Sequence, residues 1–454
     1  MHHHQPDILQ NLRREFSSGR LWLDRTVVLA YAVIAGLSVV AFTFLTNQAF
    51  AYFQRVYHWQ GGWAVLVWIP TWSAAIVWAT RRFAPTTAGS GIPQVIAALD
   101  PAVAEAERSI FVSLRLTLAK LVLGSAGFLA GMSVGKEGPS VQIAAGVMRH
   151  ARRWLGPHSG ISDHALLVAG GAAGIAAAFN APLAGVLFAI EELSRKLESR
   201  SSGLIITGIV LAGLMGVSFY GNHSYYGVIV VPPLDWSALA PGLMVVLVCG
   251  ALGGLFAKVM ATSLTGAPER LNVLRARFPV RFAAAGGLMI ALMGLATGGA
   301  TFGAGSEAVQ HMLAGHADVP AFYVTLKFIA TWLTAWCGVP GGIFAPSLSI
   351  GAGVGHNVSL LMGADIAPAL IAMGMAAFLA AVTQAPLTAF IIVMEMIDGH
   401  ALVLSLMAAA MLSSLISRLI AKPLYETLAA HMVAVLKAPA APDPSAPAAD
   451  APPH

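Results

Sequence analysis

Two charged residues, Lys136 and Glu137, interrupt a stretch of the chain that is otherwise uncharged from Leu121 to Met148. They belong to the sequence GKEGPS, in which Gly and Pro directly follow the acid. Pro near the first position of a helix is a start signal, so Glu137 is predicted at a helix N-terminus. Unpaired N–H groups and the positive dipole end attract anions there. A carboxylate at this place would occupy an anion site, and its protonation would open that site to a free anion.

The same pair could instead be a structural ion pair at a membrane surface. An ionised carboxylate near the bilayer centre costs at least about 2.5–3.5 kcal/mol, which makes such a residue functional by default. Ser90 in GSGIP and Phe344 in GGIFAP also stand where short helices are predicted to begin. Three positive helix ends without a fixed cation beside each would bind an anion moderately and let it leave, as conduction requires.

The elements that carry these residues are predicted to lie in a membrane. Hydrophobic residues make up 57% of the 454-residue chain and charged residues 10%, against roughly 25% charged in soluble domains. Several uncharged runs are long enough to cross a hydrocarbon core, which needs about 20 apolar residues. These runs are Thr26–Gln54, Val56–Thr80, Gly203–Leu234, Phe328–Ala364 and Ile366–Met394. We therefore predict an all-α polytopic membrane protein in a lipid bilayer.

The net charge of +5 does not indicate a nucleic-acid partner. Lys and Arg cluster between the apolar runs, which fits cytoplasmic loops and anionic headgroups. Arginines before the first run favour a cytoplasmic N-terminus. Cys249 and Cys337 are isolated in apolar runs, so neither a disulfide nor a metal site is predicted, and no cofactor is expected.

An internal repeat relates the two halves of the chain. Two residue pairs share an offset of 207 and two share an offset of 204. The pairs are Pro139 with Pro346, Gly146 with Gly353, Pro182 with Pro386, and Glu191 with Glu395. Two copies of one unit, each with Gly- and Pro-broken helices, are typical of a transporter core with its site at the repeat interface.

The repeat suggests how the chain is divided. We expect a cytoplasmic N-terminal segment over 1–26 and a membrane domain over 27–436. The first repeat would span about 27–234 and the second about 237–430. Residues 437–454 are mostly Ala, Pro and Asp and are predicted to be a disordered tail.

Four motifs carry a resemblance to a known family. GSGIP (Gly89–Pro93), GKEGP (Gly135–Pro139), GGIFAP (Gly341–Pro346) and KPLYE (Lys422–Glu426) occur in the order found in the CLC chloride channels and transporters. The chain resembles this family from roughly Val27 to Leu436. The resemblance implies a homodimer with a pore in each subunit, built from two inverted-topology halves with broken, re-entrant helices.

The resemblance also implies roles for individual residues. Glu137 resembles the external gating glutamate, which occupies the outer anion site when ionised. Glu192 resembles the inner proton-transfer glutamate that marks exchangers. The implied chloride ligands are the hydroxyls of Ser90 and Tyr425 and the backbone at Gly91, Ile343 and Phe344.

The function implied is a secondary chloride/proton antiporter, in a membrane that we expect to be the bacterial inner membrane. The alternative is a passive, voltage- or pH-gated chloride channel of the same fold, and Glu192 favours exchange because channel members usually lack this acid. Within the resemblance, Ser90 favours chloride over nitrate and fluoride.

Simpler interpretations remain open for several of these residues. Ser90 could be a helix N-cap, Tyr425 an interfacial belt tyrosine, and Glu192 part of a solvated helix end. Lys120 resembles the family's buried lysine but could equally be a snorkelling lysine. Glu191 and Glu395 are expected to be structural acids.

An enzymatic reading rests on GMSVG (Gly131–Gly135), which fits the G-x-S-x-G pattern of a serine nucleophile. Such a nucleophile needs a histidine base, and neither His164 nor His356 has a supporting pattern. We therefore do not expect an enzyme.

Overall fold

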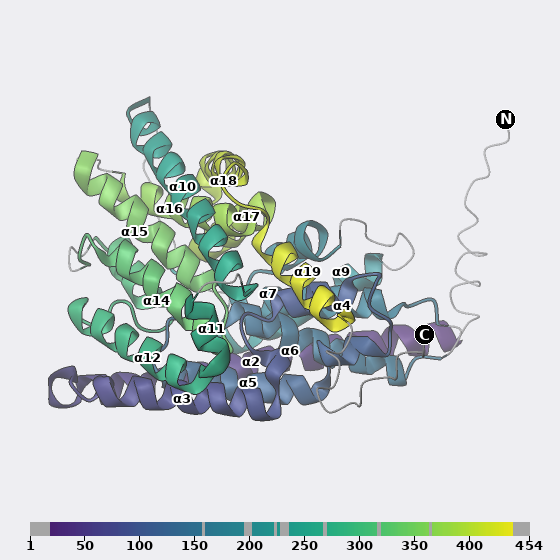
Figure 1. The fold of residues 1–454 in the computed structure, drawn as a ribbon. Coiled ribbons are helices and arrows are strands. Elements are labelled where there is room, and N and C mark those ends of the chain that lie inside the picture. The colour runs from purple at the N-terminus through teal and green to yellow at the C-terminus, as the bar shows by residue number, and fades with distance from the viewer. Residues whose placement is uncertain are drawn as a thin grey trace, which may run out of the picture.

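The computed structural model describes residues 19–438, apart from 157–158, 195–201, 222–224, 228–235, 267–269, 316–318 and 363–365. The predicted tail from residue 439 and most of the predicted N-terminal segment lie outside the described residues. Within the described part, the regular elements are helical, and two isolated bridges are the contacts that resemble strand pairing. The predicted all-α fold is confirmed (Figure 1).

Short breaks divide each half of the chain into long and short helices. The first half contains α2 (Gly19–His58), α3 (Val65–Phe83), α4 (Ile92–Leu99), α5 (Leu114–Leu129), α6 (Glu137–His150), α7 (Asp163–Phe179), α8 (Pro182–Phe188) and α9 (Ser202–Tyr220). The second half contains α10 (Leu239–Leu264), α11 (Arg270–Arg277), α12 (Pro279–Ala296), α13 (Ser306–Leu313), α14 (Tyr323–Cys337), α15 (Phe344–Met362), α16 (Ala367–Thr383), α17 (Pro386–Ile397), α18 (Val403–Arg418) and α19 (Leu424–Lys437).

Six of these helical segments are long and apolar enough to cross a membrane. The uncharged runs do not correspond one to one with helices, however. The run Val56–Thr80 contains the end of α2 and most of α3, and glycines with positive φ separate the two. The run Ile366–Met394 contains α16 and most of α17, which part at the left-handed Gln384. The run Phe328–Ala364 likewise contains the end of α14 and all of α15, so a charge-free run is not the same as a single helix here.

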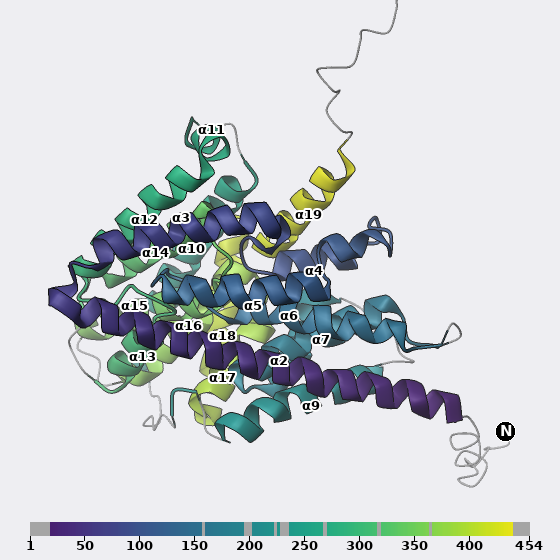
Figure 2. The same ribbon diagram turned by 90° about the horizontal axis from the view of Figure 1, so that it is seen from below.

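The two halves form packed groups that meet at the centre of the molecule. α6 packs on α7 in the first group, and α15 packs on α16 at the corresponding place in the second. The 40-residue α2 runs along the side of the molecule seen from below (Figure 2). α4 and α6 begin where predicted, and α4 is short, with eight residues, as predicted. The prediction of a short helix at Phe344 was wrong, because α15 extends over 19 residues.

Reciprocal contacts show how the halves are related. The N–H of Gly135 donates to the carbonyl of Gly342 at 2.8 Å, and the N–H of Gly342 donates back to Gly135 at 2.7 Å. These glycines are 207 positions apart, the offset of the repeat. A contact in which residue i meets j and j meets i in return is typical of a two-fold axis. The pseudo-two-fold axis therefore passes between these two glycines.

A second reciprocal contact joins α8 and the turn that follows it to α17. Glu191 accepts hydrogen bonds of 3.1 and 2.7 Å from N–H groups in the first turn of α17. Glu395 accepts bonds of 3.3 and 2.8 Å from N–H groups in the first turn of α8. Each acid thus caps the helix of the other repeat, where carboxylates are favoured by the free N–H groups. The expectation that both acids are structural is confirmed, and we call this pair the carboxylate clasp.

Candidate functional site

The site lies where α4, α6 and α15 begin, close to the pseudo-two-fold axis. Gly91 is the N-cap of α4 with a φ of 110°, a conformation that favours glycine. A Cβ on Gly91 would lie 2.6 Å from the carbonyl oxygen of Gly138 in α6. A Cβ on Gly138 would in turn meet Ser90 Oγ and the Cα of Gly342. Glycine at these positions therefore lets the three helix starts approach one another.

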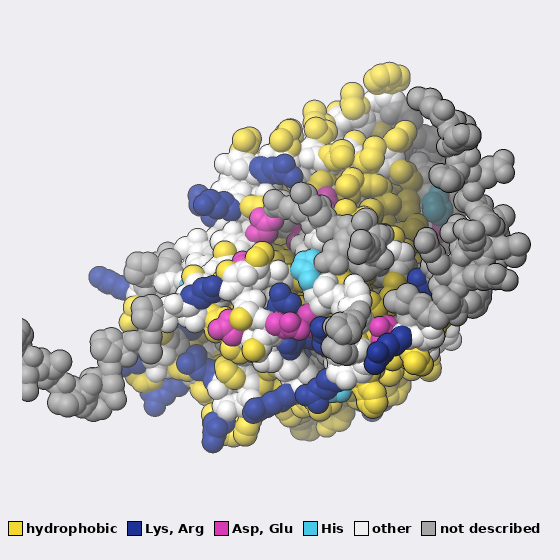
Figure 3. Space-filling model, turned by 90° about the vertical axis from the view of Figure 1, so that its right-hand side faces the viewer, with side chains coloured by type: hydrophobic (Ala, Val, Ile, Leu, Met, Phe, Trp, Pro, Cys, Tyr) yellow, Lys and Arg dark blue, Asp and Glu magenta, His cyan; other side chains and the backbone are white. Residues whose placement is uncertain are grey.

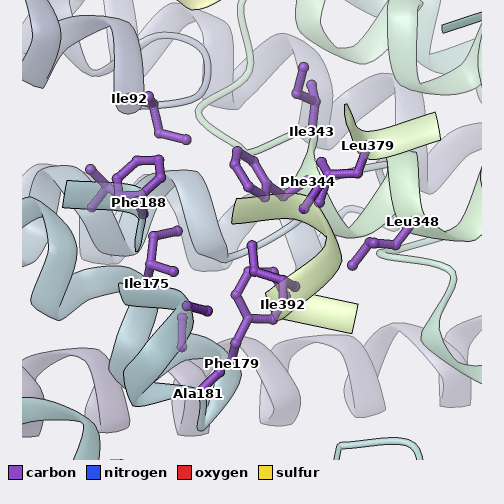
Figure 4. Close-up of a cluster of buried hydrophobic side chains, with 14 of the residues drawn as sticks. Ile92, Ile175, Phe179, Ala181, Phe188, Ile343, Phe344, Leu348, Leu379 and Ile392 are labelled. Carbon is purple, nitrogen blue, oxygen red and sulfur yellow. The ribbon is translucent and has the colours of Figure 1, made fainter. Parts of the chain in front are cut away.

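The first turn of α19 completes the site. The Tyr425 ring stacks on Phe344, with centroids 5.9 Å apart and an interplanar angle of 8°. Phe344 also contacts Phe179 and Phe188, and these rings lie together in the apolar cluster of Figure 4. Tyr425 is 1% exposed. The interpretation of Tyr425 as an interfacial tyrosine was therefore wrong, because such a residue needs contact with the headgroup region.

Within the part of the chain that the structure describes, three buried polar atoms at the site form no well-aligned hydrogen bond. They are Ser90 Oγ, Tyr425 Oη and Glu137 Oε2. The Ser90 and Tyr425 side chains face each other. More than about 90% of buried polar groups in proteins are paired, so unpaired hydroxyls from the loop before α4 and from α19 indicate a place for a polar or charged ligand.

Ser90 does not act as the N-cap of α4. Gly91 holds that position, and its N–H donates to the side-chain oxygen of Gln94 at 2.9 Å. The Ser90 hydroxyl is thereby left over from helix capping. The same bond engages the Gly91 N–H, so the contribution of Gly91 to the site is the shape of the turn. Ile343 and Phe344 stand at the start of α15, where N–H groups have no acceptor within the helix.

Glu137 is the first residue of α6 and is 1% exposed. Its carboxylate lies against the N–H groups of Lys136 and Glu137 and against that of Ala345 in the first turn of α15. The neighbouring Lys136 is 6% exposed, and its ammonium lies 5.4 Å from the centre of the Tyr225 ring. A pair buried to this extent is not a membrane-surface ion pair. The carboxylate instead rests at the positive ends of two helices.

Glu192 lies in a π-helical turn, Ala189–Leu193, that follows α8. Single π-turns are frequent at functional sites. This turn carries Glu191 and Glu192 to different places, because Glu191 belongs to the clasp while Glu192 lies within electrostatic range of the Tyr425 hydroxyl. Glu137 lies within the same range of that hydroxyl. The Tyr425 hydroxyl is thus close enough to interact electrostatically with both Glu137 and Glu192.

Lys120 is fully buried in α5. Its ammonium donates to the carbonyls of Thr87 and Gly89 at 2.7 and 2.6 Å. The snorkelling alternative was therefore wrong, because the ammonium points into the protein at the loop that carries Ser90. Lys327 in α14 is equally buried and donates to the carbonyls of Thr301 and Gly303.

Sequence reasoning missed Lys327 and the π-turn. Lys327 follows Lys120 by 207 positions. Applying the repeat offset to every charged residue would have found it. The π-turn has no comparable signal, because a single inserted helical residue leaves the apolar pattern nearly unchanged.

The serine-nucleophile pattern forms a different contact. Ser133 Oγ lies 2.8 Å from the hydroxyl of Thr331 in the second half of the chain. A hydroxyl cannot act as the base that the pattern requires. Ser133 therefore joins the two repeats.

Comparison with known proteins agrees with this architecture. Residues 72–418 match the family model described as voltage gated chloride channel. The chain is 30% identical over 387 residues to the H(+)/Cl(−) exchange transporter ClcA of Vibrio parahaemolyticus, covering 79% of this chain and 80% of the relative. It is also 30% identical over 415 residues to the protein of the same name from Klebsiella pneumoniae, covering 87% and 86%.

Solved structures show the same fold. The structure of a slow cyanobacterial Cl−/H+ antiporter superimposes with a TM-score of 0.76 at 25% identity, over 90% of this chain and 98% of that one. A CLC-type fluoride/proton antiporter superimposes with a TM-score of 0.72 at 21% identity, over 89% and 97%. With six membrane-length apolar helices and a family match over most of its length, the chain is a multi-pass integral membrane protein that belongs to the voltage gated chloride channel (CLC) family.

Proposed function

We propose that this protein is a secondary chloride/proton antiporter in which Glu137 is the protonatable gate. The observation that carries the proposal is that Ser90, Tyr425 and Glu137 each bury a polar atom without a well-aligned hydrogen bond to any described residue. Relatives at 30% identity are H(+)/Cl(−) exchange transporters, which supports coupling of the two ions.

The gate works by competition for helix N-termini. When Glu137 is ionised, its carboxylate holds the N–H groups at the starts of α6 and α15 and excludes a free anion. Protonation removes the charge, so the side chain leaves and chloride takes its place. Each cycle of entry therefore requires a proton on Glu137, and this requirement couples the two ions.

Chloride further inside is held by the hydroxyls of Ser90 and Tyr425 and by the N–H groups of Ile343 and Phe344. Two hydroxyl donors and backbone dipoles give moderate binding, which lets the anion leave again. Glu192 supplies protons to the gate from the inner side. Its partly buried position in the π-turn, within range of Tyr425, supports this role.

The orientation in the membrane follows from charge. Lys and Arg side chains are spread over the face at the right of Figure 1, where α2 begins (Figure 3). The positive-inside rule assigns such a face to the cytoplasm. A homodimer in a bacterial inner membrane belongs to the proposal and rests on family resemblance.

Simultaneous recording of chloride efflux and pH in reconstituted vesicles tests this function. We expect a chloride gradient to drive protons against their own gradient. Chloride flux without proton movement would instead assign the protein as a passive anion channel of the same fold.

A further inference from the structure

Lys327 is a buried charged residue that the proposed transport mechanism does not use. It is fully buried, and it donates to the carbonyls of Thr301 and Gly303 at 2.9 and 2.7 Å. Among the described residues, no carboxylate forms an ion pair with it. A buried cation without a counterion is costly and acts over a long range in a low dielectric. Its placement therefore calls for a function.

The loop that Lys327 holds forms one wall of a cavity next to the gate. This cavity of about 450 Å³ is lined by Lys136, Glu137 and Tyr225 on one side and by most of residues 297–308 on the other. Ala300, Phe302 and Ala304 face the cavity, whereas the intervening Thr301 and Gly303 turn their carbonyls to Lys327. The ammonium thus holds the loop at Thr301 and Gly303, on the side that faces away from the cavity. We call this cavity the outer vestibule.

The loop has little regular structure of its own. It contains four glycines with positive φ between residues 298 and 305, and such residues have many conformations available when unrestrained. Phe302 anchors it to α2 by ring contacts of 5.0 Å with Phe53 and 5.3 Å with Tyr57. Lys327 is the anchor to α14. Ser349 in α15 donates to the carbonyl of Gly305 at 3.1 Å, at the far end of the loop. Among the described residues, removing Lys327 would therefore leave Thr301 and Gly303 themselves held to a neighbouring helix only through the ring of Phe302.

Repeat one contains the same kind of lysine–carbonyl contact, but its loop has additional backbone hydrogen bonds. Lys120 holds the corresponding loop through the carbonyls of Thr87 and Gly89. That loop is also paired with repeat two, because the Gly89 N–H and carbonyl bond to Val339 and Gly341 at 3.3 and 3.0 Å. Among the described residues no such pairing ties the Thr301–Gly303 loop to repeat one. The conformation of the Thr301–Gly303 loop therefore depends more on Lys327 than the conformation of the Thr87–Gly89 loop depends on Lys120.

We propose that Lys327 is a positioning residue of the outer vestibule: it holds the Thr301–Gly303 loop in shape and gives the cavity a positive potential that draws external anions to Glu137. This inference rests on the proposed function for the identity of the anion. The shape and the potential of the cavity can be measured without transport.

The test uses a single thiol in the vestibule, introduced as Ala304→Cys. Ala304 lines the cavity and is partly exposed, while the native Cys249 and Cys337 are buried. Modification rates are measured by mass spectrometry with an anionic, a cationic and a neutral methanethiosulfonate of similar size. The ratio of anionic to cationic rates reports the local potential, and the neutral rate reports the shape.

We expect Lys327→Met to lower the anionic-to-cationic ratio by about tenfold and to change the neutral rate. Lys327→Arg should keep both, and Lys327→Gln should lower the ratio with less effect on the neutral rate. Lys120→Met is the matched control and should leave the ratio unchanged, because Lys120 holds the other loop. If Lys327→Met does not yield folded protein, the Gln and Arg variants carry the comparison.

Unchanged rates in folded Lys327→Met, or in the Gln variant where the Met variant does not fold, would overturn the inference. An equal drop in the ratio for Lys120→Met would overturn it as well. In transport assays, Lys327→Met should raise the external chloride concentration for half-maximal flux by several-fold with a smaller effect on the maximal rate. If no chloride flux is found in the native protein, the proposed function fails, and the thiol rates still decide the role of Lys327.

Discussion

Glu137 begins α6, and Phe344 begins α15 at the position related to it by the repeat offset of 207. The same comparison extends through the site. Ser90 precedes the N-cap glycine of α4, whereas Ala304 precedes the N-cap glycine of α13. Glu192 lies in a π-turn, while its counterpart Met396 continues the α-helix of α17.

The contacts that hold the two repeats together are, in contrast, shared. The lysines behind the loops, the clasp acids and the central glycines occur in both repeats at the same relative positions. The two repeats are therefore alike in the contacts that join them and differ at the residues of the proposed site. In the proposed pathway, the side chain of Glu137 in repeat one can change its charge, whereas that of Phe344 at the related position in repeat two cannot.

Neutralising the acid of this pair should have the largest effect. We expect Glu137→Gln to retain chloride flux and to reduce proton movement to background, because the amide resembles the protonated carboxyl and cannot change charge. Parallel records of chloride and pH in vesicles would show it. Phe344→Leu, at the related position, should alter the chloride rate while proton coupling remains. Uphill proton movement by Glu137→Gln would show that the gate is elsewhere.

The π-turn gives the next comparison. Glu192→Gln should also uncouple protons from chloride, because the inner side then lacks its titratable group. Glu191→Gln is the matched control, since it is adjacent in sequence but bonded to α17. The same vesicle assay distinguishes the two. Normal coupling in Glu192→Gln would make it a surface acid.

Ser90 and Ala304 allow a smaller effect to be tested. Ser90→Ala copies the residue of repeat two and removes one hydroxyl donor, so chloride affinity should fall by about tenfold, or about 1.4 kcal/mol. Isothermal titration of chloride in detergent would measure it. Ser413→Ala, in which the hydroxyl removed is buried in α18, is the control. Equal affinities for Ser90→Ala and the native protein would exclude a direct contact.

Substitutions in the carboxylate clasp should have the smallest effect, and the loss of stability should be equal for its two acids. Glu191→Gln and Glu395→Gln should each lower stability by about 1 kcal/mol, because each loses charge-assisted bonds to a helix N-terminus. Thermal unfolding in detergent should give similar decreases in melting temperature for the two variants. A much larger decrease for one of them would show that the clasp is not symmetric in energy.

The sequence predicted the starts of α4 and α6 because Gly and Pro mark helix starts by local sterics. It predicted the repeat because packing at the repeat interface requires Gly and Pro at related positions. It did not predict that the Gly91 N–H is taken by Gln94 or that Ser90 is left unpaired, since these outcomes depend on which side chain reaches a shared donor. The break between α2 and α3 falls at Gly61 and Gly62, a Gly-Gly turn signal that a search for charge-free runs does not take into account.

The reciprocal bond between Gly135 and Gly342 has a consequence for ancestry. A protein consisting of one half of this chain, paired with an oppositely oriented copy, would form the same central bond and the same clasp. Both copies would then carry an acid, or both an aromatic ring, and the assembly would be identical when viewed from either side of the bilayer. Because the two halves of this chain have different sequences, that constraint does not apply, and the two ends of the pathway can differ chemically.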